Sequence, residues 1–366
     1  MQSKKILVFH PIIAPYRIDF FNEFSKHFKT RICLFQNNLI SQKFDYSKIE
    51  EQFNFTPIYI ERSKGFFYWI LGIIHQLRQF TPDIVLCSEY GIATILVILF
   101  KILTLKKYRI VSVVDDSYNM IAEGNQFSLK HAWATKLVAP FLDNIINVEP
   151  RVVDYYKKKY NKGIFMPIIV DENKARDKYQ KLLPTSKELV LKYNLNNKKI
   201  LLFVGRLVGL KNLPFAIESF IEANVDNSIF VIVGDGPEKK HLERMTVNKK
   251  NIIFTGRLEG DYLYAWYNIA SVFTLPSTQE AFGAVTNEAL IGGCYCLVSK
   301  LAGSNCLIKE NINGNVIDPY NKIHYIQILK DAFGKAEPIS LPLYLRTNGM
   351  QIQFEKCFNK LAIEIQ

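Results

Sequence analysis

Short runs of apolar residues alternate with longer amphipathic stretches along most of the chain. In the first half, the runs are apolar throughout rather than at every second position, which is typical of parallel strands buried on both faces. These predicted strands are residues 6–9, 30–35, 84–87, 109–114 and 144–148. Helix-length stretches lie between them, at residues 17–28, 66–80 and 92–105. This strand–helix rhythm predicts a doubly wound α/β domain with a parallel sheet.

The pattern weakens over residues 165–197, where charge rises and Pro167 and Pro184 interrupt it, so this segment is predicted to be a linker. The rhythm then restarts. The further predicted strands are residues 199–204, 229–233, 252–254, 272–275 and 296–299. A second sheet of the same kind is therefore expected.

We expect two Rossmann-like domains that face each other across a cleft. The first spans residues 1–168 and the second residues 169–347, and a C-terminal helix at about residues 348–366 is expected to pack back on the first. Ligands of such sheets bind beyond the carboxyl ends of the strands. Functional residues are therefore sought in the loops that follow each predicted strand.

Composition narrows the class of protein. The 366 residues are 49% hydrophobic and 22% charged, a balance typical of soluble globular proteins. None of the six cysteines forms a C-x-x-C pair, which favours buried thiols in a reducing compartment over a zinc site. Residues 6–9 are too short for a signal peptide, and no stretch of 18 uncharged apolar residues exists. We therefore expect a cytoplasmic protein.

The net charge of +12 leaves several partners open. Nucleic acid, an anionic membrane surface and phosphorylated small molecules all attract a basic protein, and abundant surface lysine is an equally good explanation. A nucleic-acid interface needs a clustered basic face with interleaved aromatic residues. The lysines here are scattered, so nucleic acid is not expected as a partner.

The first candidate for chemistry follows the predicted strand at residues 199–204. Gly205 allows the backbone to turn close to a ligand, and Arg206 and Lys211 then present two cations at the carboxyl edge of the sheet. Such a pair neutralises a diphosphate, both when it binds and when it leaves. Two ordinary surface cations explain the same pattern, so this segment does not decide the function alone.

Two further glycine turns mark the same edge. Residues 234–237 read G-D-G-P, which is neither a G-x-G-x-x-G fingerprint nor a Walker loop, and an ordinary strand–helix turn accounts for them. Gly256, Arg257 and Leu258 follow the strand at residues 252–254 in the same way.

The most informative segment is residues 275–290. A predicted strand ends at Leu275, a polar loop carries Glu280, and a helix is expected to begin at Gly283 and contain Glu288. Backbone amides at a helix start attract a phosphate, and a carboxylate accepts hydrogen bonds from vicinal hydroxyls of a sugar or ribose. A solvated Glu288 and a Glu280 that stabilises the helix dipole remain the alternative.

These segments resemble the family 4 glycosyltransferases, which are retaining enzymes of the GT-B fold. Residues 280–288 read E-A-F-G-A-V-T-N-E, similar to the E-x7-E motif of that family, and G-R-x4-K-N, G-D-G-P and L-P-S precede it in the family's order. A-G-S-N and N-G-N follow at residues 302–305 and 313–315. The resemblance covers residues 199–318 and is of the bacterial polysaccharide-biosynthesis type.

The resemblance implies a nucleotide-diphosphate sugar as donor. Arg206 and Lys211 are expected on the diphosphate, Glu280 on the transferred sugar and Glu288 on the ribose. The remaining expected donor-binding residues are Gly205, Arg257, Leu258, Ala281, Phe282, Gly283, Ala284 and Val285. Because the two cations can stabilise the leaving group, no metal and no further cofactor are expected.

The N-terminal half resembles the family less. A P-Y-R-x-D-F-F segment at residues 15–21 is similar to that of family members with lipid-linked or polysaccharide acceptors. Arg17 is therefore a candidate to meet an acceptor phosphate, and an ordinary arginine in the first turn of a helix is the alternative. Relatives often supply a histidine after the strand at residues 109–114, where this chain has Asp115 and Asp116. Those two are acceptor-side candidates, and no histidine is assigned this role.

The expected function is retaining transfer of a sugar to a saccharide or lipid-linked saccharide, in capsule or lipopolysaccharide synthesis. Apolar residues 66–74 and 95–105 have basic flanks, which allows peripheral contact with an anionic bilayer, although buried core helices give the same pattern. The alternatives are a sugar-nucleotide epimerase or a phosphorylase of the same fold, a catalytically inactive scaffold, and a basic nucleic-acid-binding protein.

Overall fold

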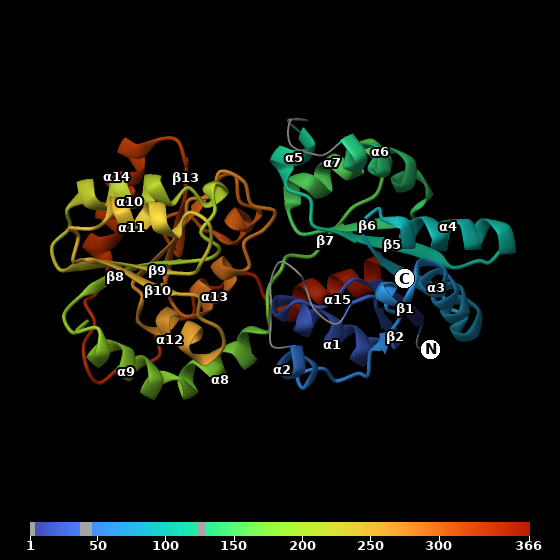
Figure 1. Cartoon of the computed structure of the whole chain (residues 1–366), viewed down its shortest axis with the longest axis horizontal. Coiled ribbons are helices and arrows are strands. Elements are labelled where there is room, and N and C mark those ends of the chain that lie inside the picture. The colour runs from blue at the N-terminus through green and yellow to red at the C-terminus, as the bar shows by residue number, and fades with distance from the viewer. Residues whose placement is uncertain (1–3, 37–45, 123–128) are drawn as a thin grey trace. The chain divides into compact units, whose positions relative to one another are not determined.

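The computed structural model describes residues 4–36, 46–122 and 129–366. It divides into two compact units (Figure 1). Unit 1 contains residues up to Val170 together with Glu355–Gln366, and unit 2 is the continuous stretch Asp171–Phe354. Each unit is an α/β layer structure around its own parallel sheet, as the apolar runs predict.

The described part of unit 1 contains a seven-stranded sheet in the order β3-β2-β1-β4-β5-β6-β7. Every pairing is parallel, and the central strands are almost fully buried because helices cover both faces. The strands are β1 (Lys5–His10), β2 (Lys29–Leu34), β3 (Ile58–Tyr59), β4 (Ile84–Ser88), β5 (Arg109–Val114), β6 (Asn144–Asn147) and β7 (Ile164–Phe165).

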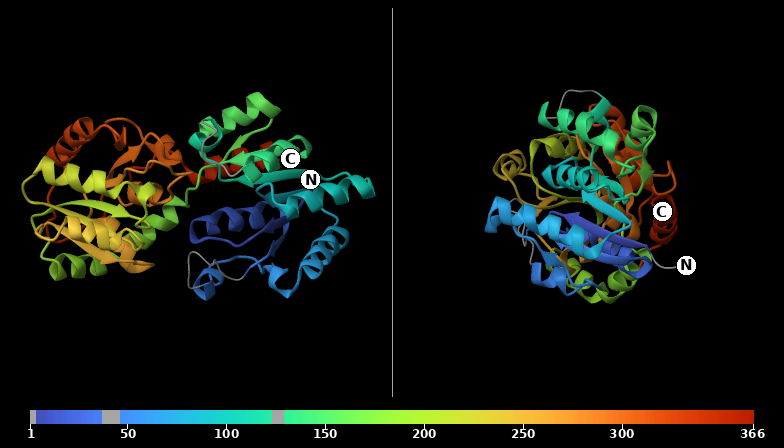
Figure 2. Two further views of the ribbon diagram at one scale, coloured as in Figure 1. Left: turned by 45° about the horizontal axis from the view of Figure 1, so that its top comes forward. Right: turned by 90° about the vertical axis from the view of Figure 1, so that its right-hand side faces the viewer.

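One face of this sheet is covered by a single large apolar core. It contains Trp69 and Ile73 of α3, Val97 of α4, Val138 of α6 and Tyr156 of α7, together with residues of the strands. The helices of unit 1 are α1 (Ile18–His27), α2 (Tyr46–Glu50), α3 (Phe66–Phe80), α4 (Ile92–Thr104), α5 (Tyr118–Ala122), α6 (Leu129–Val138), α7 (Pro150–Tyr160) and α15 (Phe354–Glu364). The layers can be followed in Figures 1 and 2.

Helix α15 joins α1 although more than 300 residues separate them in the sequence. The ring of Phe358 lies edge-on to the rings of Phe20 and Phe24, at centroid distances of 6.2 and 5.1 Å. Phe358 is fully buried, as are Leu361 and Ile365 at the end of the chain. The last residues therefore complete the core of unit 1.

Unit 2 contains a six-stranded parallel sheet in the order β10-β9-β8-β11-β12-β13. Its strands are β8 (Lys199–Val204), β9 (Ser228–Val233), β10 (Ile252–Gly256), β11 (Val272–Leu275), β12 (Tyr295–Ser299) and β13 (Gly314–Ile317). Its helices are α8 (Glu172–Lys181), α9 (Leu183–Lys192), α10 (Leu213–Ala223), α11 (Lys239–Met245), α12 (Asp261–Ile269), α13 (Val285–Ile291) and α14 (Lys322–Lys335).

The linker prediction for residues 165–197 is wrong. Most of this segment forms α8 and α9, and α9 packs on α12, where Ser186 donates a hydrogen bond of 3.1 Å to the carbonyl of Ala265. Pro184 lies in the first turn of α9, where a backbone amide has no hydrogen-bond acceptor within the helix, so the missing amide of proline does not destabilise the helix. Only one side of each helix is buried, through residues such as Tyr179 and Leu189, so the composition of the segment resembles that of a linker.

Both sheets have one topological switch point. In unit 1 the strand order reverses between β1 and β4, and in unit 2 between β8 and β11. Loops that follow the two strands diverge there and leave room for a ligand at the carboxyl edge. Among the described residues, no helix is both long and apolar enough to cross a bilayer.

Candidate functional site

The switch point of unit 2 brings the predicted donor-side residues to one edge of the sheet. Strands β8 and β11 are neighbours, paired through Leu201 and Val272. The loop after β8 carries Arg206 and Lys211, and the loop after β11 carries Glu280. Residues separated by about 70 positions in the sequence therefore meet at the carboxyl ends of adjacent strands.

Lys211 and Glu280 form an ion pair across this switch point. The ammonium group of Lys211 donates to the carboxylate of Glu280, and the two side chains are 17% and 18% exposed. Lys211 ends the short 3-10 helix η4 (Gly209–Lys211), and Asn212 after it has φ +54° and donates a hydrogen bond of 2.9 Å to the carbonyl of Pro319. Arg206, earlier in the same loop, is exposed.

The backbone around Glu280 is clamped against residues 302–304. Glu280 forms an isolated parallel bridge with Ala302, and its carbonyl accepts a hydrogen bond of 3.2 Å from the amide of Gly303. The amide of Ser304 donates to the carbonyl of Phe282 at 2.8 Å. A Cβ atom on Gly303 would lie 2.2 Å from the carbonyl oxygen of Ala281, so only glycine allows this approach. The A-G-S-N segment thus fixes the loop that carries Glu280.

Helix α13 begins at Val285, two residues later than expected. Gly283 has φ +95°, which is outside the helical region, and a Cβ atom there would lie 2.5 Å from Leu275. Gly283 therefore turns the chain between loop and helix. Phe282 is buried and anchors this turn, whereas Ala281, Ala284 and Val285 are partly buried. The first amide of the helix with a backbone acceptor is that of Thr286, which donates to Gly283.

Glu288 lies in α13 and is held by tyrosines of α12. Tyr267 donates a hydrogen bond of 2.9 Å to its carboxylate, and the hydroxyl of Tyr264 lies 3.5 Å from the other oxygen. Burial raises the pKa of Glu288 to about 7, although these tyrosines and the nearby charge of Lys178 act in the opposite direction. The carboxyl group is therefore poised to be neutral or ionised near neutral pH.

The G-D-G-P turn at residues 234–237 packs closely against the backbone of the loop after β8. A Cβ atom on Gly234 would lie 1.9 Å from the carbonyl oxygen of Gly205, and one on Gly236 would lie 2.4 Å from that of Leu207. The two glycines of G-D-G-P are therefore required by backbone packing. Arg257 forms an ion pair with Glu259, and Leu258 between them is partly buried.

In unit 1, Arg17 reaches the loop after β5. Its guanidinium forms an ion pair with the carboxylate of Asp115, and the Arg17 side chain is only 6% exposed. His10, at the end of β1, lies close to this pair. Burial and the neighbouring Arg17 lower the pKa of His10 to about 4, so its ring is neutral at physiological pH.

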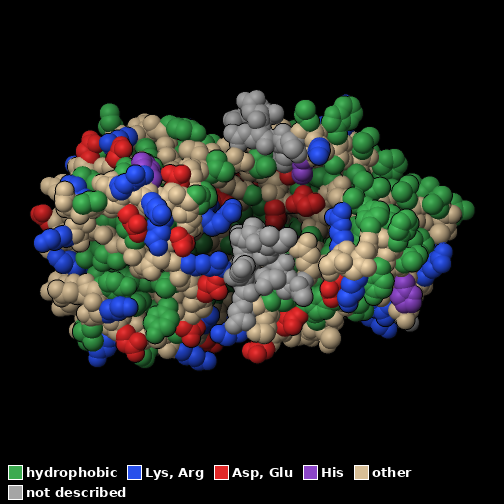
Figure 3. Space-filling model, in the orientation of Figure 1, with side chains coloured by type: hydrophobic (Ala, Val, Ile, Leu, Met, Phe, Trp, Pro, Cys, Tyr) green, Lys and Arg blue, Asp and Glu red, His purple; other side chains and the backbone are tan. Residues whose placement is uncertain are grey.

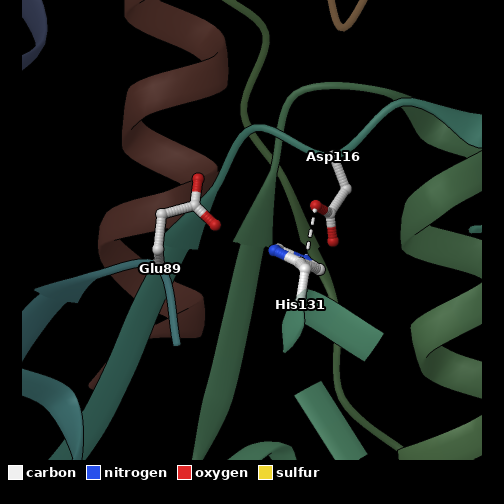
Figure 4. Close-up of side chains that lie close together, drawn as sticks. All are labelled: Glu89, Asp116 and His131. Carbon is white, nitrogen blue, oxygen red and sulfur yellow. Dashed lines mark ion pairs between the residues drawn. The ribbon is translucent and has the colours of Figure 1, made fainter. Parts of the chain in front are cut away.

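A second group of polar side chains lies beside the Arg17–Asp115 pair (Figure 4). Glu89 follows β4, Asp116 follows β5 and His131 comes from the start of α6, and one ligand atom of each lies within 4.8 Å of the others. His131 is 3.2 Å from Asp116, whose other oxygen accepts a hydrogen bond of 2.5 Å from Tyr156.

The crowding of carboxylates affects Glu89. Burial, with the charges of Asp116 and Asp115, raises the pKa of Glu89 to about 8, so it carries a proton at neutral pH. Glu89 has φ +58°, and its Oε1 atom accepts a hydrogen bond of 3.1 Å from the amide of Asp115. Two carboxyls and an imidazole form a set that can ligate a divalent cation or transfer protons.

Several residues at these two edges escape sequence reasoning. His131, Glu89, Tyr264 and Tyr267 carry no motif, and each is placed by a contact between elements that are distant in the sequence. The available signal is that Glu89 lies two residues after the predicted strand at residues 84–87.

Comparison with known proteins gives a family match within unit 2. Residues 187–337 match the family model described as Glycosyl transferases group 1. The GDP-mannose-dependent alpha-mannosyltransferase of Corynebacterium glutamicum is 35% identical over 121 residues, which are 33% of this chain and 28% of that protein. An Escherichia coli enzyme, UDP-Gal:alpha-D-GlcNAc-diphosphoundecaprenol alpha-1,3-galactosyltransferase, is 33% identical over 137 residues, 33% of each chain. The chain thus aligns with about a third of the length of these relatives.

The fold similarity extends over nearly the whole chain. HepE of Anabaena, whose structure was solved in complex with UDP and glucose, has a TM-score of 0.70 at 16% identity, covering 91% of this chain and 90% of that one. The sequence match lies in the unit that carries Lys211, Glu280 and Glu288. Residues 187–337 therefore match the group 1 glycosyltransferases in sequence, and the fold of the whole chain is similar to that of HepE.

Proposed function

We propose that the chain is a retaining glycosyltransferase that moves a sugar from a nucleotide-diphosphate sugar to a saccharide or lipid-linked saccharide in cell-surface polysaccharide synthesis. The observation that supports it most is the Lys211–Glu280 ion pair at the switch point of unit 2. It places a cation for a diphosphate beside a carboxylate for sugar hydroxyls.

The donor-side roles follow from this arrangement. Arg206 and Lys211 bind the diphosphate, Glu280 accepts hydrogen bonds from the transferred sugar, and Glu288 accepts them from the ribose. When Lys211 turns to the diphosphate, Glu280 is released for the sugar. The remaining lining of the donor site comes from the loop edges and the turn before α13, at Gly205, Arg257, Leu258, Ala281, Phe282, Gly283, Ala284 and Val285.

Transfer proceeds on the face from which the diphosphate departs. The bond between the anomeric carbon and the diphosphate oxygen breaks as the acceptor oxygen bonds to that carbon, and the acceptor proton passes to the leaving phosphate. Arg206 and Lys211 stabilise the negative charge that develops there, so this chemistry needs no metal ion.

The acceptor side is proposed at the carboxyl edge of unit 1. Arg17, Asp115 and Asp116 lie there, and Arg17 offers a guanidinium to an acceptor phosphate. A diphosphoundecaprenol-linked acceptor appears in the name of the Escherichia coli relative, which favours a lipid-linked acceptor for this chain too. We accordingly propose a cytoplasmic protein that contacts the membrane peripherally.

The test is a panel of nucleotide sugars. Thermal-shift measurements on the wild type and Glu288→Ala should find one donor family that stabilises the wild type and stabilises the variant less. Incubation of that donor with a lipid-linked acceptor should then give a glycoside with the donor's anomeric configuration, read by NMR. Conversion of the donor into its epimeric nucleotide sugar without an acceptor would identify an epimerase, and an absence of stabilisation by every nucleotide sugar would contradict the proposal.

A further inference from the structure

The outer sides of three helices in unit 1 expose an unusual amount of apolar surface. We call it the α3–α4–α6 face and define it by the residues named here. Phe67 is 80% exposed, Leu103 80% and Trp133 60%. The other members are Phe66, Tyr68, Leu71, Ile92, Ile95, Leu99, Ile102, Leu105, Leu129, Leu137 and Phe141.

These residues share one layer of the structure. The inner sides of α3, α4 and α6 contribute Ile73, Val97 and Val138 to the same core on the same side of the sheet. Their outer sides therefore point away from that core together. In Figure 3, hydrophobic side chains cover the part of the molecule where Figure 1 labels α3 and α4.

The exposed apolar residues recur at helical spacing, so they line up along one side of each helix. On α6, Leu129, Trp133 and Leu137 are four positions apart and form one stripe, while Val138 is buried. On α4, Ile92, Ile95 and Leu99 form a similar stripe. Helix α4 therefore has two apolar sides. One side packs in the core, and the other is exposed to a partner outside unit 1.

The charged side chains on the three helices have one sign. Helices α3, α4 and α6 contain no aspartate or glutamate. Lys106 and Lys107, exposed directly after α4, lie at its edge together with Arg62 and Lys136. The guanidinium of Arg62 lies 5.4 Å from the ring of Trp69, and Lys136 lies 5.8 Å from that of Trp133. Cations beside aromatic rings are typical of residues at the headgroup level of a bilayer.

We propose that the α3–α4–α6 face binds an anionic lipid bilayer, with the three helices lying in the headgroup region. The apolar side chains enter the lipid and the cations contact anionic headgroups. A second copy of the chain fits less well, because two such faces would bring cations together without a carboxylate from these helices. The inference deepens the proposed function, since it gives the enzyme a route to a lipid-linked acceptor.

Vesicle flotation tests the proposal directly. Wild-type protein should float with vesicles of phosphatidylcholine mixed with phosphatidylglycerol, float much less with phosphatidylcholine alone, and be released by high salt. The double variant Phe67→Asp/Leu103→Asp should bind the anionic vesicles at least tenfold more weakly. Both side chains are 80% exposed, so unit 1 should remain folded, as circular dichroism would show. Ile323→Asp is the matched control, because Ile323 is 84% exposed on α14 of unit 2.

Three outcomes would overturn the proposal: no flotation of the wild type with anionic vesicles, equal binding by the double variant, or a dimer in sedimentation that the double variant abolishes. Activity separates this inference from the proposed function. The double variant should keep wild-type turnover on a soluble acceptor analogue and lose it on acceptor embedded in anionic vesicles. Flotation without any transfer would contradict the proposed function and leave the membrane face intact.

Discussion

Lys211 neutralises Glu280 across the switch point between β8 and β11. The pair is mostly shielded from water, so each charge depends on the other for compensation. Under the proposed function, a bound diphosphate replaces Glu280 as the anionic partner of Lys211 and leaves the carboxylate to the sugar.

Removal of the Lys211 charge should mainly affect turnover. Lys211→Met should lower kcat by about 100-fold or more, as loss of one preorganised stabiliser of transition-state charge does, with a smaller change in the KM of the donor. Lys199→Met is the control, because Lys199 donates to the carbonyl of Phe333 at the amino end of β8. Steady-state kinetics measures both, and a variant that changes only the donor KM would contradict the leaving-group role.

The raised pKa of Glu288 predicts a pH dependence of stability. Between about pH 4.5 and 7 the folded protein keeps the Glu288 proton that the unfolded chain has lost, so the free energy of unfolding falls as the pH rises. Glu288→Gln removes this contribution. The unfolding free energy of the variant relative to the wild type should therefore increase by about 3 kcal/mol across that range.

Urea titrations at several pH values measure this difference. Glu243→Gln, at an exposed position of α11, is the control and should stay at a constant offset from the wild type. A constant offset for Glu288→Gln as well would show that burial does not hold the proton on Glu288.

Gly283 should tolerate no side chain. Gly283→Ala combines a positive φ with a Cβ atom 2.5 Å from Leu275, so we expect a loss of about 2–4 kcal/mol in unfolding free energy and weaker donor binding. Gly334→Ala is its counterpart, because no atom lies within 4 Å of a Cβ there, in α14. That change should raise stability by up to about 1 kcal/mol. Equal effects of the two variants in denaturant melts would refute the steric argument.

Arg17 should contribute to binding of the acceptor and not to binding of the donor. Arg17→Lys keeps the charge but loses the planar fork that faces Asp115, so the acceptor KM should rise about tenfold while the donor KM stays the same. Arg31→Lys is the matched control, since Arg31 lies in β2 and donates to Gln76 and Gln79. A change in the donor KM alone would place Arg17 outside the acceptor site.

The sequence predicts best what local pattern determines. The strand at residues 199–204 has the predicted bounds, because both its faces are buried and every position is apolar after Lys199. β13 was missed, since Gly314–Ile317 is a short edge strand with half-buried Asn315. Helices α8 and α9 were missed for the related reason that each buries one side only.

The same distinction applies to the candidate site. Glu280 and Lys211 are recognisable because motifs fix their places at strand ends, and the fold brings them together as two parallel strands require. The tyrosines that hold Glu288 come from α12, and no local pattern links α12 to α13. Contacts of that kind depend on how helices pack on the sheet, which a single sequence does not encode as a periodicity.

The return of the chain to unit 1 at α15 has a consequence for biosynthesis. Unit 2 is one uninterrupted stretch, whereas unit 1 receives Phe358, Leu361 and Ile365 only after all of unit 2 has been made. Unit 2 therefore contains its whole core in one stretch of the chain, whereas unit 1 lacks the aromatic partner of Phe20 and Phe24 on α1 until α15 packs there. Loss of the last dozen residues would consequently damage the unit made first and spare the one made second.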